Sequence, residues 1–362
     1  MVEQYLDYIT GLRQKFHKYP ELSNQEFLTN QEILKVLRKD NIEFETVGTG
    51  VIARLNLQKE KTIAYRCDLD ALPIIEKNDV AFKSKNENMH ACGHDGHIAI
   101  LLTFIKWAVK NKDKIKYNLV FIFQPAEESS GGALKMIEAG CLKNVDEIYA
   151  IHVNPDIEAG VFGAKSGLLM AGVVEFDIDF SGVSCHVADY KKGIDANAAA
   201  VEFLAGNIIS EPLKDRTIFH CGKLFGGYAR NVVSNFCKLE CTVRFFDTND
   251  RNQIFECIKK RLNEVNKKNK TDSKTNIITE YVPLVNDDTC IKKIKKLAKC
   301  VDIEKKFSAE DFAFYLTKVK GAFVWLGTKD KKHFAPLHSD NFNFDEKHLI
   351  TGLKLYIDLA VN

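Results

Sequence analysis

The spacing of hydrophobic residues changes along the chain, and this change restricts the folds that the chain can adopt. Up to residue 168, apolar runs with strand character alternate with stretches in which apolar residues recur every three or four positions, as on an amphipathic helix. Alternating strands and helices predict an α/β fold with a mainly parallel sheet. Strands are expected at 51–57, 62–66, 118–123 and 147–153, and helices at 6–18, 24–39, 97–109 and 132–139.

The segment 169–282 follows a different pattern, which indicates an inserted domain. Its first strand, VVEFDIDF at 173–180, alternates acidic and apolar residues, as a strand with one solvated face in an antiparallel sheet does. The elements expected after it are a helix over 195–209, strands at 217–221 and 238–246, a helix over 249–266 and a strand at 275–281. The order βαββαβ predicts a ferredoxin-like unit.

The first pattern returns after this segment, with a helix from residue 287, a strand at 322–326 and a final helix from residue 345. We therefore expect a discontinuous domain made of 1–168 and 283–362. In open sheets of this kind, ligands bind beyond the carboxyl ends of the strands.

The composition excludes several classes of function. The 51 lysines and arginines nearly balance the 49 aspartates and glutamates, so a net charge of +2 provides no field to attract nucleic acid or an anionic membrane. No apolar run reaches the roughly 20 residues that a membrane-spanning helix needs. No signal peptide is expected from the first residues, and the ten irregularly spaced cysteines are expected as reduced thiols. We therefore expect a cytoplasmic protein without nucleic-acid or membrane partners.

Side chains that can bind metal ions or transfer protons follow several of the predicted strands. They lie in three short segments, YRCDLDALP, NMHACGHDGH and FIFQPAEESSGG, and at two isolated histidines. The candidates are Asp68, Asp70, His90, Cys92, His94, Asp95, His97, Glu127, Glu128, His152 and His338. Thiolate, imidazole and carboxylate are ligands of zinc and related metals, so this combination predicts a metal site.

Two details of these segments favour a metal site that performs hydrolysis. Gly93 gives the backbone the freedom to bring Cys92 and His94 to one centre. The adjacent Glu127 and Glu128 can divide two tasks, because one can bind metal while the other acts as a general base for water.

Each signal alone also has a simpler explanation. An isolated histidine such as His152 or His338 is more often structural than a ligand, and adjacent glutamates often only begin a helix. Cys92 beside histidines could be the nucleophile of a cysteine hydrolase. A non-catalytic, metal-dependent binding module would keep the ligands without needing Glu127. The joint occurrence at successive strand ends favours the metal site over packing.

Longer segments between residues 13 and 346 carry a resemblance to a known family. They read RQKFHKYPELSNQE, YRCDLDALP, NMHACGHDGH, FIFQPAEE, GGALKMIEAG, IHV, SGLLMA, AEDFAFYL, VWLGT and LHSDNFNFDE. The chain resembles the metal-dependent amidohydrolases that include hippurate hydrolases, auxin-conjugate hydrolases and N-acyl-amino-acid deacylases, and that are related to aminoacylase. The resemblance implies a zinc-peptidase-like catalytic domain, here 1–168 and 283–362, with an inserted lid and dimerisation domain, here 169–282.

The resemblance also implies roles for single residues. Two divalent metal ions per subunit are expected, zinc or manganese first, with cobalt or nickel as alternatives. The implied metal ligands are Cys92, His94, Glu128, His152 and His338. Glu127 would be the general base and Asp70 a second catalytic acid that orients a ligand. Cys92 could bridge the ions as a thiolate, with the Asp95 carboxylate as the alternative bridge, and the role of Asp68 stays open.

In the inserted domain, the resemblance implies that His186 and Asn231 contact the substrate and stabilise the oxyanion. The sequence departs from the family pattern nearby, at Ser184-Cys185 and at Cys241. These changes bear on the identity of the substrate more than on the type of reaction.

The expected reaction is hydrolysis of the amide bond of a small N-acyl amino acid by a homodimer that pairs through the lid. Within the family, the chain is most similar to deacetylases of N-acetyl-diaminopimelate in lysine biosynthesis, which makes that compound the first expected substrate. A hippurate-type or other N-acyl amino acid is the alternative.

Overall fold

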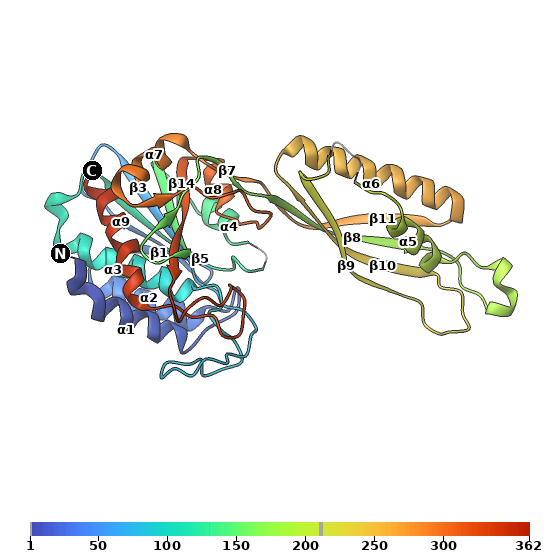
Figure 1. Ribbon diagram of the computed structural model, residues 1–362, viewed down its shortest axis with the longest axis horizontal. Coiled ribbons are helices and arrows are strands. Elements are labelled where there is room, and N and C mark those ends of the chain that lie inside the picture. Colours follow the sequence, from blue (N-terminus) through green and yellow to red (C-terminus); the bar gives the residue numbers. More distant parts are fainter. Residues whose placement is uncertain (1, 130, 210–212) are drawn as a thin grey trace. The chain divides into compact units, whose positions relative to one another are not determined.

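The computed structural model describes residues 2–129, 131–209 and 213–362, and Figure 1 shows the course of the chain. The chain forms two compact units: unit 1 contains the residues up to 169 with 285–304 and 311–362, and unit 2 contains 170–284 with 305–310. The sequence pattern predicts 305–310 as part of the discontinuous domain. These residues group with unit 2, where the Ala171 N–H donates to the carbonyls of Lys306 and Ser308.

An eight-stranded mixed sheet is the centre of unit 1. Its strands lie in the order β1-β2-β4-β3-β5-β14-β6-β13. Their bounds are β1 Glu43–Val47, β2 Gly50–Leu55, β3 Thr62–Asp68, β4 Asn118–Gln124, β5 Glu147–Glu158, β6 Phe162–Gly163, β13 Cys300–Val301 and β14 Lys320–Lys329. The prediction of parallel strands holds for the central β4, β3, β5 and β14, whereas β2 and β6 run antiparallel to their neighbours in this group. The edge strand β1 was not predicted, because its exposed residues give it no apolar run.

Helices lie against this sheet (Figure 1). The α-helices of unit 1 are α1 Leu6–His17, α2 Phe27–Lys39, α3 His94–Lys110, α4 Ala133–Glu138, α7 Asp288–Leu297, α8 Ala313–Leu316 and α9 Leu349–Val361. Short 3-10 helices are η1 Val2–Tyr5, η2 Lys112–Lys114 and η5 Glu346–His348. The buried α3 contacts β3, α1 and α9. It begins three residues before the predicted start, because Gly93, at φ +86°, turns the chain into the helix.

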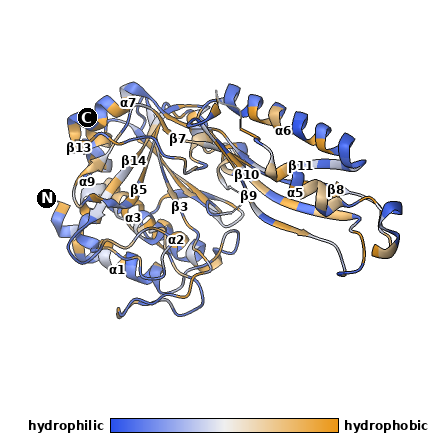
Figure 2. Cartoon of the chain, turned by 45° about the vertical axis from the view of Figure 1, so that its right-hand side comes forward, coloured by the Kyte–Doolittle hydropathy of each residue, from blue (hydrophilic) through white to orange (hydrophobic). Residues whose placement is uncertain are grey.

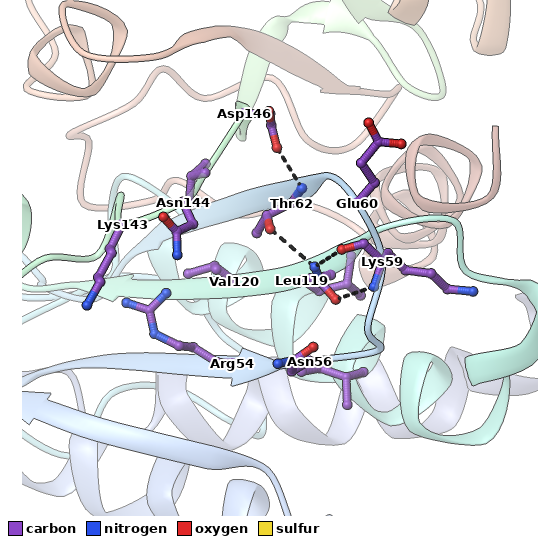
Figure 3. A pocket seen from close by; sticks show the side chains of 13 residues that line it. Arg54, Asn56, Lys59, Glu60, Thr62, Leu119, Val120, Lys143, Asn144 and Asp146 are labelled. Carbon is purple, nitrogen blue, oxygen red and sulfur yellow. Dashed lines mark hydrogen bonds between the residues drawn. The ribbon is translucent and has the colours of Figure 1, made fainter.

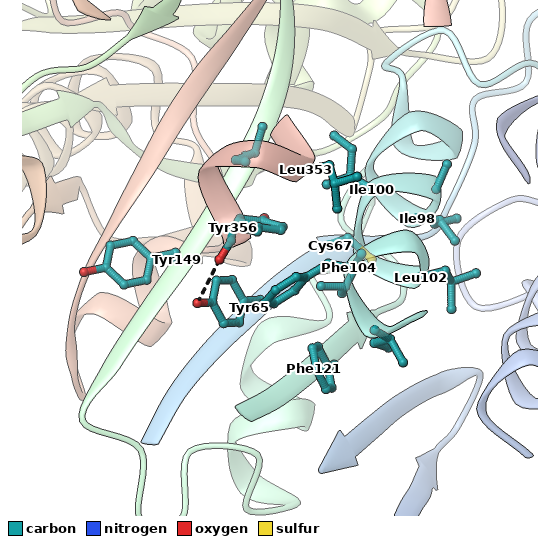
Figure 4. Close-up of a cluster of buried hydrophobic side chains, with 14 of the residues drawn as sticks. Tyr65, Cys67, Ile98, Ile100, Leu102, Phe104, Phe121, Tyr149, Leu353 and Tyr356 are labelled. Carbon is teal, nitrogen blue, oxygen red and sulfur yellow. Dashed lines mark hydrogen bonds between the residues drawn. The ribbon is translucent and has the colours of Figure 1, made fainter. Parts of the chain in front are cut away.

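Aromatic rings fill the space between the sheet and α3. Tyr65 of β3 lies with its ring centroid 4.8 Å from those of both Phe104 and Tyr356, in edge-to-face geometry. Its hydroxyl donates to the carbonyl of Tyr356 at 3.4 Å (Figure 4). These contacts join β3, α3 and α9, so the strand end that carries Asp68 and the helix start that carries His94 are fixed to one rigid core.

Unit 2 has the predicted chain order βαββαβ. Its elements are β8 Gly172–Ser181, η3 Val187–Lys192, α5 Ala196–Ala205, β9 Thr217–Gly226, β10 Phe236–Phe245, α6 Thr248–Asn269 and β11 Asp272–Tyr281. The sheet order β11-β8-β10-β9 with all neighbours antiparallel is the ferredoxin-like arrangement. Apolar side chains occupy every second position of β8 and β10, so they share one face of the sheet and form a core with α5 and α6. In Figure 2, α6 accordingly carries apolar residues between hydrophilic ones.

Two short strands, β7 Gly167–Met170 and β12 Leu284–Asn286, form a separate two-stranded sheet. Within the described part of the chain, no helix combines the length and the apolar character that a membrane span requires.

Two glycines of unit 1 give opposite predictions for an added methyl group. In β14, a Cβ on Gly321 would lie 2.1 Å from the carbonyl oxygen of Ile148 in β5, so we expect Gly321→Ala to destabilise unit 1 by about 1–3 kcal/mol. In the middle of α1, a Cβ on Gly11 meets no atom within 4 Å, so Gly11→Ala should stabilise by about 1 kcal/mol. Urea unfolding followed by the fluorescence of Trp107 and Trp325, the two tryptophans of the chain, reads both changes. Equal urea midpoints of unfolding for the two variants would contradict the close approach of β5 and β14 at Gly321.

Candidate metal centre

The sequence-predicted ligands of unit 1 lie at the carboxyl edge of the parallel strands. Asp68 is the last residue of β3, Glu127 and Glu128 follow β4, and His152 lies in β5 beyond its last pairing with β3. Cys92 precedes α3, and His94 is its first residue. The prediction from strand ends therefore holds, because parallel strands deliver these side chains to one edge.

Three short distances link the five residues that the resemblance implies as ligands into a group of three and a pair. His94 Nε2 lies 3.8 Å from Glu128 Oε1, and His338 Nε2 lies 3.4 Å from the same oxygen. Cys92 Sγ lies 3.3 Å from His152 Nε2. Donor atoms of Cys92, His94 and Glu128 all lie within 4.8 Å of one another. Sulfur, nitrogen and oxygen donors thus converge as a site for divalent metals requires.

Buried atoms without hydrogen-bond partners indicate that this group is built to hold something. Both ring nitrogens of His94 and Oε1 of Glu128 are buried, and no hydrogen bond reaches them from the described residues. Burial lowers the pKa of His94, but the carboxylates of Asp68, Asp70 and Glu128 outweigh it and raise the pKa to about 10. The site therefore attracts positive charge, which a divalent cation would supply together with the missing contacts.

A second group contains Asp68, His94, His97 and His152, whose donor atoms lie within 4.8 Å of one another. His97 Nδ1 lies 2.6 Å from Asp68 Oδ1, and the backbone N–H of Val153 donates to His97 Nε2 at 2.9 Å. Because Nε2 accepts this bond, the proton of the neutral ring lies on Nδ1 and faces Asp68. His97 thus has both nitrogens in use and acts as a support, which leaves His94 and His152 as the histidines of this group that can bind metal.

A contact with Arg66 explains the role of Asp68, for which the sequence offered no prediction. Its guanidinium donates to Asp68 Oδ2 at 2.7 Å and to Asp311 Oδ1 at 3.0 Å, and all three side chains are buried. Asp311 in turn accepts the backbone N–H groups of Gly132 and Ala133 at the start of α4. The sequence analysis did not single out Arg66, although a charged residue at the end of a predicted buried strand was a usable signal.

Asp70 shapes the turn that carries the two glutamates. Its carboxylate accepts the backbone N–H of Glu127 at 3.1 Å and that of Glu128 at 2.9 Å, as well as the hydroxyl of Ser23 at 2.6 Å. Asp70 Oδ1 also lies 3.5 Å from His94 Nδ1. One buried carboxylate therefore orients both a candidate ligand and the backbone of the Glu127–Glu128 pair.

The same turn contains a strained residue. Ala126 has φ +58°, in the left-handed region of the backbone map. This conformation raises the free energy of any residue other than glycine. Its N–H donates to Glu26 Oε1 at 2.9 Å, and the Thr49 hydroxyl donates to Glu26 Oε2 at 2.6 Å. Strain held by a buried carboxylate is typical of functional turns, since such backbone persists only where its surroundings enforce it.

Two other candidates from the sequence lie apart from these groups. Asp95 forms an ion pair with Arg13 at 2.9 Å and meets His17 Nδ1 at 2.7 Å, so one of its carboxylate oxygens is bound to two side chains of α1. His90 is buried, and burial lowers its pKa to about 4, so its ring is neutral. Neither belongs to a metal-ligand group among the described residues.

In unit 2, the structure brings His186 and Asn231 to one exposed place. The Val187 N–H donates to the carbonyl of Asn231 at 2.9 Å, and His186 forms a β-bridge with Val232. His186 Nδ1 also accepts the N–H of Ala188 at 3.1 Å and so caps η3.

A polar pocket of about 580 Å³ lies at the opposite edge of the large sheet, at the amino ends of β3 and β4. Figure 3 shows Arg54 and Lys143 there, with Thr62 donating its N–H to Asp146 at 2.8 Å. None of the site residues predicted from the sequence is among its lining residues. The candidate site is therefore the carboxyl edge, where the titratable side chains gather.

Comparisons with known proteins agree with this geometry. The chain is 35% identical to an uncharacterized hydrolase of Staphylococcus haemolyticus, covering 99% of this chain and 98% of the relative. It is 31% identical to a dinuclear metal-binding peptidase of the M20 family from Bacillus subtilis, with a TM-score of 0.86 over 99% of this chain and 98% of that structure. An aminobenzoyl-glutamate utilization protein from Klebsiella pneumoniae, 18% identical, shares the fold with a TM-score of 0.78 over 100% and 97% of the two chains.

The family model of peptidase family M20/M25/M40 matches residues 64–362. This match and the relatives confirm the resemblance to metal-dependent amidohydrolases that the sequence motifs indicated. The chain thus belongs to peptidase family M20/M25/M40 and is a hydrolase of amide or peptide bonds.

Proposed function

We propose that this hydrolase removes the acyl group of a small N-acyl amino acid with the help of two divalent metal ions. The proposed ligands are Cys92, His94, Glu128, His152 and His338. The observation that carries this proposal is the convergence of their donor atoms around buried nitrogens and an oxygen that have no hydrogen-bond partner in the described chain. When bound, the metals supply a Lewis acid that polarises the acyl carbonyl and lowers the pKa of water.

Glu127 is the proposed proton carrier. It follows the same strand as Glu128, and Asp70 binds the backbone N–H groups of both, so the two side chains leave one fixed turn. Glu128 contacts the histidines of the group, whereas Glu127 does not belong to the Cys92–His94–Glu128 cluster. Glu127 can therefore accept the proton of the attacking water and return it to the leaving amine.

His186 and Asn231 are proposed to contact the substrate and to stabilise the oxyanion, because both are exposed and lie together in unit 2. Unit 2 is proposed as the lid and as the surface through which two chains form a dimer. In that arrangement, His186 serves the active site of the partner subunit.

A cysteine nucleophile is the second candidate mechanism, since Cys92 Sγ lies 3.3 Å from His152 Nε2. Burial raises the pKa of the Cys92 thiol well above its usual value, and the nearby carboxylates of Glu128 and Glu127 act in the same direction. Burial also lowers the pKa of His152 well below its usual value. Both shifts disfavour the thiolate–imidazolium pair that a nucleophile needs, whereas a bound cation would itself favour the Cys92 thiolate.

For the substrate we propose N-acetyl-diaminopimelate, a compound of lysine biosynthesis. The similarity of sequence segments from residue 13 to residue 346 to deacetylases of this compound supports the proposal. Hippurate and other N-acyl amino acids are the competing substrates.

The division of labour between the adjacent glutamates can be tested with two matched substitutions. We expect Glu127→Gln to lower kcat at least about a hundredfold while the metal content stays the same, because it removes a proton carrier but no ligand. Glu128→Gln should instead lose metal. Metal analysis after gel filtration, together with turnover assays, measures both, and equal metal loss in the two variants would contradict the assignment.

The proposed substrate can be tested with a panel of N-acetyl-diaminopimelate, hippurate and several N-acetyl amino acids, assayed with metal-loaded protein. We expect N-acetyl-diaminopimelate to have the highest kcat/KM. Another N-acyl amino acid that is more than about tenfold better, a difference of about 1.4 kcal/mol in transition-state binding, would replace this substrate but leave the reaction class intact.

The role of His186 across the dimer can be tested by complementation. Glu127→Ala and His186→Ala chains, each inactive alone, are mixed under conditions that allow subunit exchange. If His186 acts in the partner's site, half of the dimers are mixed and each has one complete site, so about a quarter of wild-type activity should return. No recovery despite demonstrated exchange would show that His186 acts within its own chain or not at all.

A further inference from the structure

The five proposed ligands differ in how firmly the fold holds them. Four lie in regular elements of unit 1 or within four residues of one, with side chains that are buried or nearly so. His338 is the exception, because it lies in the loop 330–345 between β14 and η5, and its side chain is 53% exposed. Its backbone is also strained, with φ +65°. The attachments of this loop therefore decide where His338 lies.

The half of the loop that follows His338 is anchored in the core. Phe342 and Phe344 are buried, and Arg13 donates to Asn343 Oδ1 at 2.7 Å and to Glu346 Oε1 at 3.1 Å. His338 itself donates its backbone N–H to the carbonyl of Ala91 at 2.8 Å. This half needs no further support.

The half that precedes His338 alternates between exposed and half-buried residues. Leu337 packs against the core of unit 1, and the polar attachment of this half is the carboxylate of Asp330. Asp330 Oδ1 accepts the backbone N–H of Lys332 at 2.7 Å and that of His333 at 2.9 Å. Asp330 Oδ2 lies 2.9 Å from His333 Nδ1 and 3.4 Å from Nε2 of the buried His348. Asp330 directly follows β14 and His348 caps α9, so this contact joins the two ends of the loop.

We propose that Asp330 is a positioning residue: with His333 and His348 it closes the base of the loop and thereby holds His338 beside Glu128. The inference rests on the proposed function in one respect, namely that His338 binds one of the two metal ions. Burial opposes the charge on Asp330, but hydrogen bonds from His333 and from the backbone keep the pKa of Asp330 below its usual value, so the carboxylate is ionised near neutral pH.

The test is a zinc titration of the purified apoprotein against a chromogenic chelator, which gives the number of ions bound and the affinity for each. In wild type we expect two ions, and in His338→Ala a loss of one. Asp330→Asn should weaken that same ion about tenfold or more while the affinity for the other changes less than about twofold. The control is Asp302→Asn, which removes an exposed ion pair with Lys295 elsewhere in unit 1 and should leave both affinities unchanged.

Two further measurements distinguish the positioning role of Asp330 from a purely structural role. Asp330→Asn should lower the melting temperature of the apoprotein by only a few degrees, as the loss of a local contact does, and unfolding should stay cooperative. His348→Gln should weaken the same ion, and the double variant should be no weaker than the stronger single effect, because the two residues act as one contact. His348→Gln also serves as the test if Asp330→Asn does not fold.

Three results would overturn the inference. Unchanged zinc affinity in Asp330→Asn and His348→Gln, with an ion lost in His338→Ala, would show that the contact does not position His338. Two ions retained in His338→Ala would remove His338 from the proposed ligands and the inference with it. A third ion in wild type that is lost in Asp330→Asn would show that Asp330, Asp345 and His348, whose donor atoms lie within 4.8 Å of one another, hold a cation instead.

Discussion

The structure of unit 1 depends on a concentration of negative charge around the buried imidazole of His94. Carboxylate oxygens of Asp68, Asp70 and Glu128 lie within 3.8 Å of its ring nitrogens. Apolar packing cannot stabilise such a group, because an unpaired buried charge costs several kcal/mol. Arg66 balances part of this charge from one side. Both ring nitrogens of His94 and Oε1 of Glu128 stay without a hydrogen-bond partner among the described residues, and the proposed divalent cations would supply the missing contacts.

The supports of the site are also buried polar groups, and each connects the site to a different part of the fold. Glu26 holds the strained turn at Ala126, Asp311 holds the start of α4 and Arg66, and Arg13 holds Asp95 next to His94. Strained backbone at the turn after β4 persists because Glu26 enforces it, and at His338 the backbone N–H is held by the carbonyl of Ala91. Preorganised ligands and an adjacent proton carrier are what hydrolysis of an amide requires.

Periodicity in the sequence predicted the central strands, the helices and the βαββαβ order of unit 2, because buried faces impose a repeat of 2 or 3.6 residues. It missed β1, whose exposed edge position requires no apolar repeat. It also missed the grouping of 305–310 with unit 2, which depends on contacts between residues distant in the sequence: backbone hydrogen bonds to Ala171 and the packing of Lys305 and Phe307 on Phe246. Spacing near strand ends predicted which side chains would meet. It could not predict that His97 and Asp95 are supports, since that depends on partners such as Val153 and Arg13 that are distant in the sequence.

The most direct test of a two-metal centre is anomalous X-ray diffraction from crystals of the zinc-loaded protein. The account predicts two anomalous peaks per chain, both within bonding distance of donors from Cys92, His94, Glu128, His152 and His338, with Glu127 bound to neither ion. No peak at this edge of the sheet, or a peak bound by Glu127 in place of Glu128, would contradict the account.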